Sequence, residues 1–234
     1  MQLFYNPNIS EGDTSFNFDK DESRHIVKVL RKKVGDQLHI TNGKGWLFTA
    51  ELTLADAKHC SVNILSQNLQ LKRSFNLHLA VAPTKMNDRY EWFLEKATEI
   101  GITEITPIIC DNSERKVVKL ERFEKILQSA MKQSLQCYLP KLNAPIAFKD
   151  FVDSSFEATK FIAHCEETDK KSLKSQLKNN DDTLILIGPE GDFSVKEIEM
   201  ALAADFIPVT LGNTRLRTET AAIAACHSVA FVNE

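Results

Sequence analysis

The sequence lacks any apolar run near the roughly 20 residues that a membrane-spanning helix needs. The stretch MQLFYNPNISEGD at its start also lacks the charged, apolar and small-residue succession of a secretory signal. We therefore expect a globular protein that stays in the cytoplasm.

Paired cysteine motifs are also missing. The five cysteines are scattered, with no C-x-x-C pair and no histidine at metal-ligand spacing. This pattern excludes the usual zinc modules, so we expect no metal and five reduced, partly buried thiols. They are Cys60, Cys110, Cys137, Cys165 and Cys226.

Two phosphate-binding motifs, G-x-x-x-x-G-K-[ST] and G-x-G-x-x-G, do not occur.

The chain has 234 residues and 43% apolar content, enough for one large domain or for one of ordinary size with a small one. The formal net charge of -3 argues against a surface that binds nucleic acid everywhere.

A local basic cluster nevertheless stands near the start of the chain, where only Asp21 and Glu22 oppose six basic residues. Such a cluster is a candidate phosphate-facing patch. The alternative is an ordinary basic helix exposed to solvent. The cluster comprises Lys20, Arg24, Lys28, Arg31, Lys32 and Lys33.

Two patterns of hydrophobicity divide the chain. Residues 36–71 alternate apolar and polar side chains, with breaks at Asn42-Gly43 and Ala55-Asp56, and predict three strands of a small barrel after a helical segment at 21–33. Beyond residue 73, strands and helices alternate, which predicts an α/β domain with a parallel sheet covered by helices. We expect domains at 1–72 and 73–234. In the second, strands are expected at 75–82, 104–110, 160–165, 183–187 and 206–211, and helices at 88–101, 119–137, 170–178, from Ser194, and at the C-terminus.

The stretch TLILIGPEGDFSVKE, residues 183–197, joins a buried strand to a helix. Ser194 and Glu197 form a capping-box pattern, which predicts a helix start at Ser194. The Gly-Pro-Glu-Gly turn then lies at the carboxyl end of a strand, where ligands bind in open α/β sheets. Alternatively, the turn is only a tight connection whose glycines supply unusual backbone angles.

The carboxylate of Glu190 in this turn would repel a pyrophosphate. It suits a neutral or cationic ligand instead. S-adenosylmethionine, with its positive sulfonium and an adenine that backbone groups can recognise, is such a ligand.

A second glycine-bearing loop begins at Leu211-Gly212. Thr218 is expected to cap the last helix, with Glu219 at the positive end of the helix dipole. Arg215 and Arg217 stand just before that cap. They are either a solvated surface pair or part of the same site as the first loop.

Together these loops resemble the paired signature of the SPOUT methyltransferases. The residues concerned are 187–191 with 193–194 in the first loop, and 211–212 with 216–221 in the second. More narrowly, they resemble the RsmE family, which methylates N3 of a uridine in 16S ribosomal RNA. Further motifs follow the family order over nearly the whole chain: His25, Val29–Arg31, Gly35-Asp36, Asn42-Gly43, Glu95–Gly101, Thr106-Pro107, Ser113–Arg115 and Gln133-Ser134.

The resemblance implies a C-terminal SPOUT α/β domain with a trefoil knot and a small N-terminal PUA-like β-barrel that binds RNA. It also implies a homodimer with the C-terminal helix in its interface, and 16S ribosomal RNA or the small ribosomal subunit as partner. The cofactor would be S-adenosyl-L-methionine. The residues that would hold it are Ile187, Gly188, Pro189, Glu190, Gly191, Leu211, Gly212, Leu216 and Thr218.

For catalysis we expect Arg217 to stabilise the uracil anion and Glu190 to fix the cofactor geometry. Glu190 and Glu219 are both candidates for the general base, which stays unassigned. RNA would be placed through phosphate contacts of the basic cluster. The residues expected to make those contacts are Arg24, Lys28, Arg31 and Lys32.

Four positions depart from the family pattern. Thr214 stands where an arginine is frequent and Asp192 where a glycine is usual, while Lys132 and Gln136 replace an expected Glu and Arg. Two other functions remain open: a noncatalytic ribosome-assembly factor that binds RNA, and a SPOUT enzyme for a different nucleotide.

Overall fold

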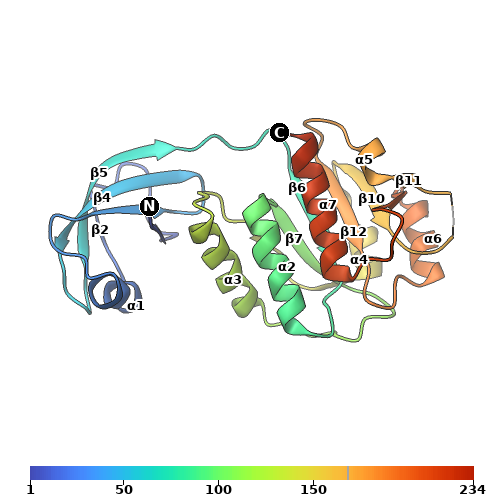
Figure 1. Ribbon diagram of the computed structural model, residues 1–234, viewed down its shortest axis with the longest axis horizontal. Helices are drawn as coiled ribbons and strands as arrows, with labels where there is room; N and C mark the ends of the chain where they lie inside the picture. The colour runs from blue at the N-terminus through green and yellow to red at the C-terminus, as the bar shows by residue number, and fades with distance from the viewer. Residues whose placement is uncertain (168) are drawn as a thin grey trace. The chain divides into compact units, whose positions relative to one another are not determined.

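A computed structural model describes residues 1–167 and 169–234, which form two compact units (Figure 1). The first unit comprises Met1–Lys72 and Met131–Leu139, and the second comprises Arg73–Ala130 and Pro140–Glu234. A single boundary near residue 72 therefore leaves out the segment Met131–Leu139. That segment belongs to the first unit because its backbone bonds there: the Leu139 amide donates to the Gly43 carbonyl at 2.9 Å.

The first unit is a five-stranded sheet in which the three expected strands are present. The strand order is β1 (Leu3–Tyr5), β3 (Gln37–Thr41), β4 (Trp46–Leu54), β5 (Ser61–Leu69) and β2 (Ser15–Asn17). Phe48, Ala50 and Leu52 alternate along β4 with more exposed residues and are fully buried. This period of two sends one face of the sheet into the core.

The helical segment of the first unit is shorter than expected. It consists of α1 (Lys20–Arg24) and a π-helical turn, η1 (His25–Val29). Asp19 caps its start by accepting the amide of Glu22 at 2.8 Å. The segment stops before Arg31, whose φ of 55° is left-handed and cannot continue the helix.

The second unit is an α/β fold with an eight-stranded sheet, as predicted from the alternation of strands and helices. Its main path runs β11-β13-β10-β12-β6-β7-β8, with β9 paired to β7, and all its pairings are parallel. The strands are β6 (Leu77–Val81), β7 (Glu104–Ile109), β8 (Lys141–Leu142), β9 (Ile146–Ala147), β10 (Thr159–Ala163), β11 (Lys171–Ser172), β12 (Thr183–Ile187) and β13 (Ile207–Thr210). The helices are α2 (Asn87–Ile100), α3 (Leu120–Gln133, whose last three residues fall in the first unit), α4 (Phe148–Val152), α5 (Leu173–Gln176), α6 (Val195–Ala203) and α7 (Thr218–Val232).

Helices cover the central strand β12, all five residues of which are buried. Helices α2 and α7 lie side by side, and α7 contacts β6 and β12 (Figure 1). Leu184 and Leu186 pack in one cluster with Phe151 of α4 and Ile198 of α6. The continuous apolar sequence of β12 is therefore typical of a strand that is buried on both faces.

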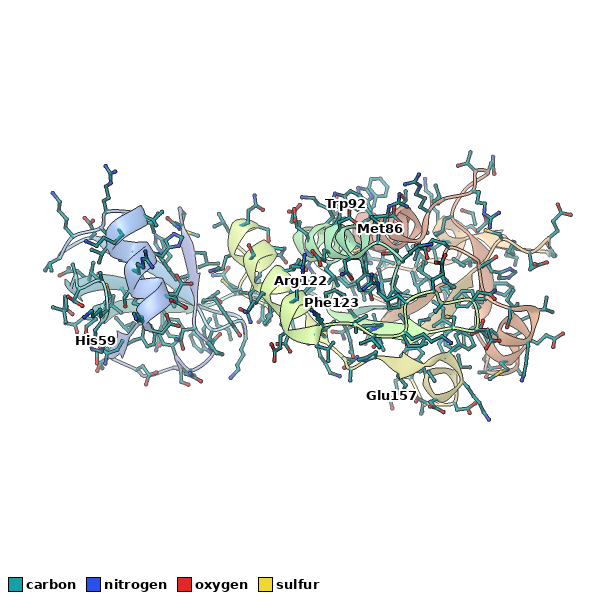
Figure 2. All side chains as sticks on the ribbon, turned by 90° about the horizontal axis from the view of Figure 1, so that it is seen from below. His59, Met86, Trp92, Arg122, Phe123 and Glu157 are labelled. Carbon is teal, nitrogen blue, oxygen red and sulfur yellow. The ribbon has the colours of Figure 1, made fainter. Side chains whose placement is uncertain are left out.

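Helix α3 packs on α2 through an aromatic stack and an ion pair (Figure 2). The rings of Phe123 and Tyr90 are 5.1 Å apart, and Arg122 Nε lies 2.6 Å from Glu91 Oε1. The helix ends earlier than the expected residue 137. Leu135 takes a left-handed φ of 58°, and the Gln136 amide donates to the Met131 carbonyl, which closes the last turn.

The polar helix expected at 170–178 is reduced to the single turn of α5, preceded by β11. In the described part of the chain, no helix is long and apolar enough to cross a bilayer.

His78 is a largely buried titratable group on β6. Its Nε2 lies 2.7 Å from Thr106 Oγ1, and its ring meets the edges of Phe151 and Phe156. Burial lowers the pKa of His78 to about 4, with Glu104 opposing the shift. The folded protein therefore holds this imidazole neutral.

We expect acid to destabilise the second unit through His78. The unfolded chain binds a proton near pH 6.5 and the folded chain only near pH 4, so this stability is complete above 6.5 and is lost as the pH falls towards 4. Between pH 7 and pH 5, the loss in the free energy of unfolding from this group is about 2 kcal/mol. Denaturant titrations should show a smaller loss in His78→Gln, and an unchanged loss in His59→Gln, an exposed control. Equal pH dependence in wild type and His78→Gln would contradict the assignment.

Candidate functional site

Two adjoining cavities lie at the carboxyl edge of the second sheet. Their volumes are about 290 and 450 Å³. They share five lining residues: Ala163, Cys165, Arg215, Leu216 and Ala221. The smaller is also lined by Ile187–Glu190, Asp192, Arg217 and Thr218; the larger by His164, Lys170 and Val209–Thr214.

Parallel registers bring the strand ends to one level. Ala163 at the end of β10 pairs with Ile187 of β12 on one side and with Val209 of β13 on the other. The loops that follow these three strands therefore start side by side. Loops after parallel strands are where α/β sheets bind ligands.

The glycines of the first loop are required by close packing. Gly188 and Gly191 do not have positive φ angles, so the expected alternative of unusual backbone angles is wrong for both. A Cβ on Gly188 would lie 3.1 Å from the Phe193 ring, and one on Gly191 would lie 3.2 Å from Asn112 Cβ. In the second loop, Gly212 does have a positive φ of 147°.

The first loop is held by hydrogen bonds from three other segments. The Thr218 hydroxyl donates to the Gly188 carbonyl at 3.0 Å. The Lys85 amide donates to Glu190 Oε1 at 2.9 Å, and Asn112 Nδ2 donates to the Gly191 carbonyl at 3.3 Å. The loop is therefore fixed before any ligand arrives.

The predicted capping box follows this loop and is confirmed. Ser194 is the N-cap of α6; its hydroxyl accepts the Glu197 amide at 3.2 Å, and its own amide donates to Glu197 Oε2 at 2.8 Å. Glu197 Oε1 also accepts the amide of Asp111, which ties the loop after β7 to the same helix start.

The second loop differs from expectation at its helix. Arg217, not Thr218, is the N-cap of α7. Thr218 is the first residue of the helix, and its hydroxyl donates to the Gly188 carbonyl. Glu219 in the first turn is only 7% exposed; Arg89 Nε lies 3.8 Å from its Oε1.

Comparison with known proteins identifies the family. An RNA methyltransferase domain matches residues 71–230, and an RNA methyltransferase PUA domain matches residues 18–65. Ribosomal RNA small subunit methyltransferase E of Buchnera aphidicola subsp. Acyrthosiphon pisum is 32% identical over 90% of this chain and 85% of its own. The chain belongs to the ribosomal RNA small subunit methyltransferase E family.

Solved structures of this family agree over the full length. A crystal structure of a probable rRNA methyltransferase from Porphyromonas gingivalis has a TM-score of 0.92 at 42% identity, covering 100% of this chain and 98% of that one. The family member from Neisseria gonorrhoeae, bound to S-adenosylmethionine, has a TM-score of 0.87 at 28% identity. The match covers 100% of this chain and 98% of that one.

The structure brings most of the family's expected cofactor residues to the two cavities, while Gly191 lines neither of them. The smaller cavity is lined by Ile187, Gly188, Pro189, Glu190, Leu216 and Thr218, together with Arg217, and the larger by Leu211, Gly212 and Leu216.

The expected RNA-contacting residues belong to the first unit. Arg24, Lys28 and Arg31 are exposed, whereas Lys32 is half-buried. Three of the four residues expected to contact RNA are thus accessible.

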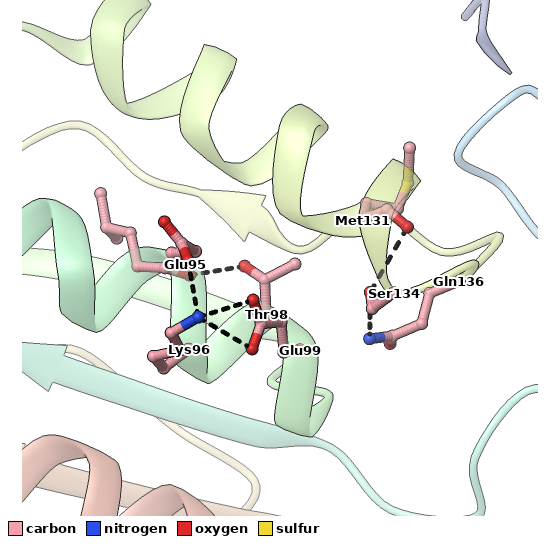
Figure 3. A network of polar contacts seen from close by, with 8 residues as sticks. Glu95, Lys96, Thr98, Glu99, Met131, Ser134 and Gln136 are labelled. Atoms are coloured by element: carbon pink, nitrogen blue, oxygen red, sulfur yellow. Dashed lines mark hydrogen bonds and ion pairs between the residues drawn. The ribbon is translucent and has the colours of Figure 1, made fainter. Parts of the chain in front are cut away.

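Another family motif, 95–101, lies in α2 and lines neither cavity. Its Lys96 Nζ lies 2.6 Å from Glu95 Oε1 and 2.9 Å from Glu99 Oε1 (Figure 3). The same figure shows Ser134 at the end of α3, whose hydroxyl donates to the Met131 carbonyl. These motif residues stabilise helix surfaces and ends.

The sequence alone did not point to the end of β10. Ala163, His164 and Cys165 line the cavities, although no glycine or charge pattern marks them. Burial lowers the pKa of His164, and Lys170 lowers it further, so the imidazole is neutral near pH 7. Cys165 is exposed rather than partly buried, whereas the other four free thiols are buried.

Among residues 1–167 and 169–234, no group of three or more His, Cys, Asp or Glu side chains could hold a metal ion.

We expect Gly188→Ala to destabilise the second unit. The added methyl would lie 3.1 Å from the ring of Phe193, which is 3% exposed and must shift to accept it. Overpacking of this kind costs about 1 to 3 kcal/mol, measurable in the free energy of unfolding by denaturant titration. Because Phe193→Leu removes part of the ring, the double variant should lose less than the sum of the two single losses. Strict additivity would contradict the proposed clash.

Proposed function

We propose that this chain is an S-adenosyl-L-methionine-dependent methyltransferase that modifies N3 of a uridine in 16S ribosomal RNA in the cytoplasm. The observation that carries the proposal is the smaller cavity, which is lined by the Gly188–Glu190 turn and by the Arg215–Thr218 segment. The bound cofactor in the Neisseria gonorrhoeae family member supports the choice of ligand.

The cavity residues fit this cofactor chemically. Glu190 and Asp192 provide carboxylates beside which a cation is favoured. Ile187, Leu216 and Ala221 provide apolar surface for a flat ring. The two volumes also suit a small-molecule site, since such sites occupy about 300 to 1,000 Å³.

In this proposal the loops hold the cofactor, which supplies a methyl group on a positively charged sulfur. Gly188 and Gly212 let a ligand approach bare backbone, and Leu211 and Leu216 cover it. Holding two reactants in line can lower a barrier by several kcal/mol without a covalent intermediate.

Arg217 is the proposed catalytic residue. Arg217 is an exposed residue that lines the smaller cavity. A uracil that has lost its N3 proton carries negative charge on its oxygens. Charge-assisted hydrogen bonds from Arg217 would stabilise that anion.

The group that takes the proton stays unassigned. Glu190 bonds to the Lys85 amide, which supports a role in cofactor geometry. Glu219 is buried, and its Oε2 has no hydrogen-bond partner among the described residues.

We further propose a homodimer and a trefoil knot. Large apolar side chains are exposed at the N-cap of α2 (Met86, 52%), on α2 (Trp92, 45%) and on α7 (Phe231, 60%). Figure 2 labels Met86 and Trp92. A second copy covering α2 and α7 would remove this surface from water. For the knot, the chain after Leu211 would pass through a loop before Thr218 reaches Gly188.

We expect Arg217→Ala to reduce methyl transfer by about 10²- to 10³-fold, because one stabilising donor for the developing anion is lost. The measurement is mass spectrometry of 3-methyluridine in 16S RNA from a strain lacking the gene, complemented with wild type or variant. Lys149→Ala, which removes an exposed cation on α4, is the control and should restore the mark. Full restoration by Arg217→Ala would exclude its role. Failure of wild type to restore any mark would favour a noncatalytic assembly factor, and a mark on another nucleotide would identify a different substrate.

We expect RNA binding to depend on salt through the basic cluster. We plot the logarithm of the binding constant against the logarithm of the salt concentration. Replacing Arg24, Lys28, Arg31 and Lys32 by glutamine should reduce the magnitude of this slope by about 3, since fewer counterions are released. Filter binding to 16S RNA fragments over a salt series measures this. Neutralising four exposed lysines of the second unit provides the control: Lys119, Lys125, Lys149 and Lys174. Equal slopes for the cluster variant and wild type would remove the cluster from the RNA interface.

A further inference from the structure

Asp192 occupies a backbone conformation that favours glycine. Its φ is 65°, in the left-handed region that glycine adopts without strain. An aspartate there is strained relative to glycine. Contacts of its side chain offset this strain.

The carboxylate of Asp192 accepts two backbone hydrogen bonds. Oδ2 accepts the Cys165 amide at 2.7 Å, and Oδ1 accepts the Phe193 amide at 2.9 Å. Asn112 Nδ2 also donates to the Asp192 carbonyl at 3.1 Å. Bonds to an ionised acceptor are the stronger kind.

The bond to Cys165 begins where the strand ladder stops. Ala163 and Ile187 are the last paired residues of β10 and β12. Beyond them, the Asp192 side chain joins the segment after β10 to the loop after β12. Cys165 and Asp192 both line the smaller cavity, so this bond connects two of its walls.

We infer that Asp192 is a positioning residue for the cofactor site, fixing the Gly188–Phe193 loop against the end of β10. This inference rests on the proposed function, because it assumes that the cavity binds S-adenosylmethionine. A glycine at this position would leave the loop more flexible, whereas the hydrogen bonds of the Asp192 side chain hold it in place. Ligand binding then has less of the loop to order, which favours affinity.

The experiment compares purified full-length variants by calorimetric titration with S-adenosylmethionine. Asp192→Gly keeps the backbone conformation without strain and removes both hydrogen bonds. Asp192→Asn fits the same conformation and keeps one acceptor oxygen. Asp205→Gly is the matched control, since Asp205 has a φ of 62°, is exposed and lines neither cavity.

Asp192→Gly should raise the dissociation constant about tenfold, as expected for the loss of one charged hydrogen bond, with a smaller rise in Asp192→Asn. The Cys165 amide should exchange faster with solvent in Asp192→Gly, as followed by NMR. The loss should raise the KM for S-adenosylmethionine more than it lowers kcat, because the contact acts on cofactor binding.

Unchanged affinity in Asp192→Gly, with wild type binding normally, would overturn the inference and leave the proposed function intact. An equal loss in Asp205→Gly would also overturn it, by showing a general effect of such substitutions. Absence of binding by wild type would instead refute the proposed function, and the inference with it.

Discussion

The hydrogen bond from the Thr218 hydroxyl to the Gly188 carbonyl joins two segments that are 30 residues apart in the chain. It is buried, and a buried carbonyl without a partner would cost free energy. It fixes the first turn of α7 against the loop after β12. Because residues of both segments line the smaller cavity, the geometry of the site depends on this contact.

Charge is divided between the two walls. The loop after β12 contributes the carboxylates of Glu190 and Asp192, and the second loop contributes Arg215 and Arg217. Arg217 is also the N-cap of α7, where the positive end of the helix dipole adds to its charge. A cationic donor and an anionic acceptor base can therefore be accommodated on different sides of one cavity, which is the arrangement that the proposed methyl transfer needs.

Much of the fold follows from local patterns in the sequence. The apolar run of β12, the capping box at Ser194 and the breaks at Asn42-Gly43 are short-range signals, and the structure confirms the elements they predict. The course of α3 was harder to predict, because its end depends on a left-handed Leu135 that no glycine marks. The segment Met131–Leu139 likewise belongs to the first unit through contacts distant in sequence, such as the bond between Thr41 and Cys137, 96 positions apart.

Site residues that belong to a sequence motif could be predicted, whereas site residues that are placed only by the pairing of strands could not. The Gly-Pro-Glu-Gly turn is conspicuous in the sequence, but the contribution of Ala163, His164 and Cys165 depends on the parallel register between β10 and β12. The Thr218 hydroxyl looked like a helix cap, since its partner Gly188 is distant in sequence. Short-range patterns do not encode such pairings.

The most direct test of the central claim is a crystal structure of the protein soaked with S-adenosylmethionine. The account predicts density for the ligand between the Gly188–Glu190 turn and the Leu216–Thr218 segment. Density at any other place on the chain, or none at saturating ligand, would contradict it.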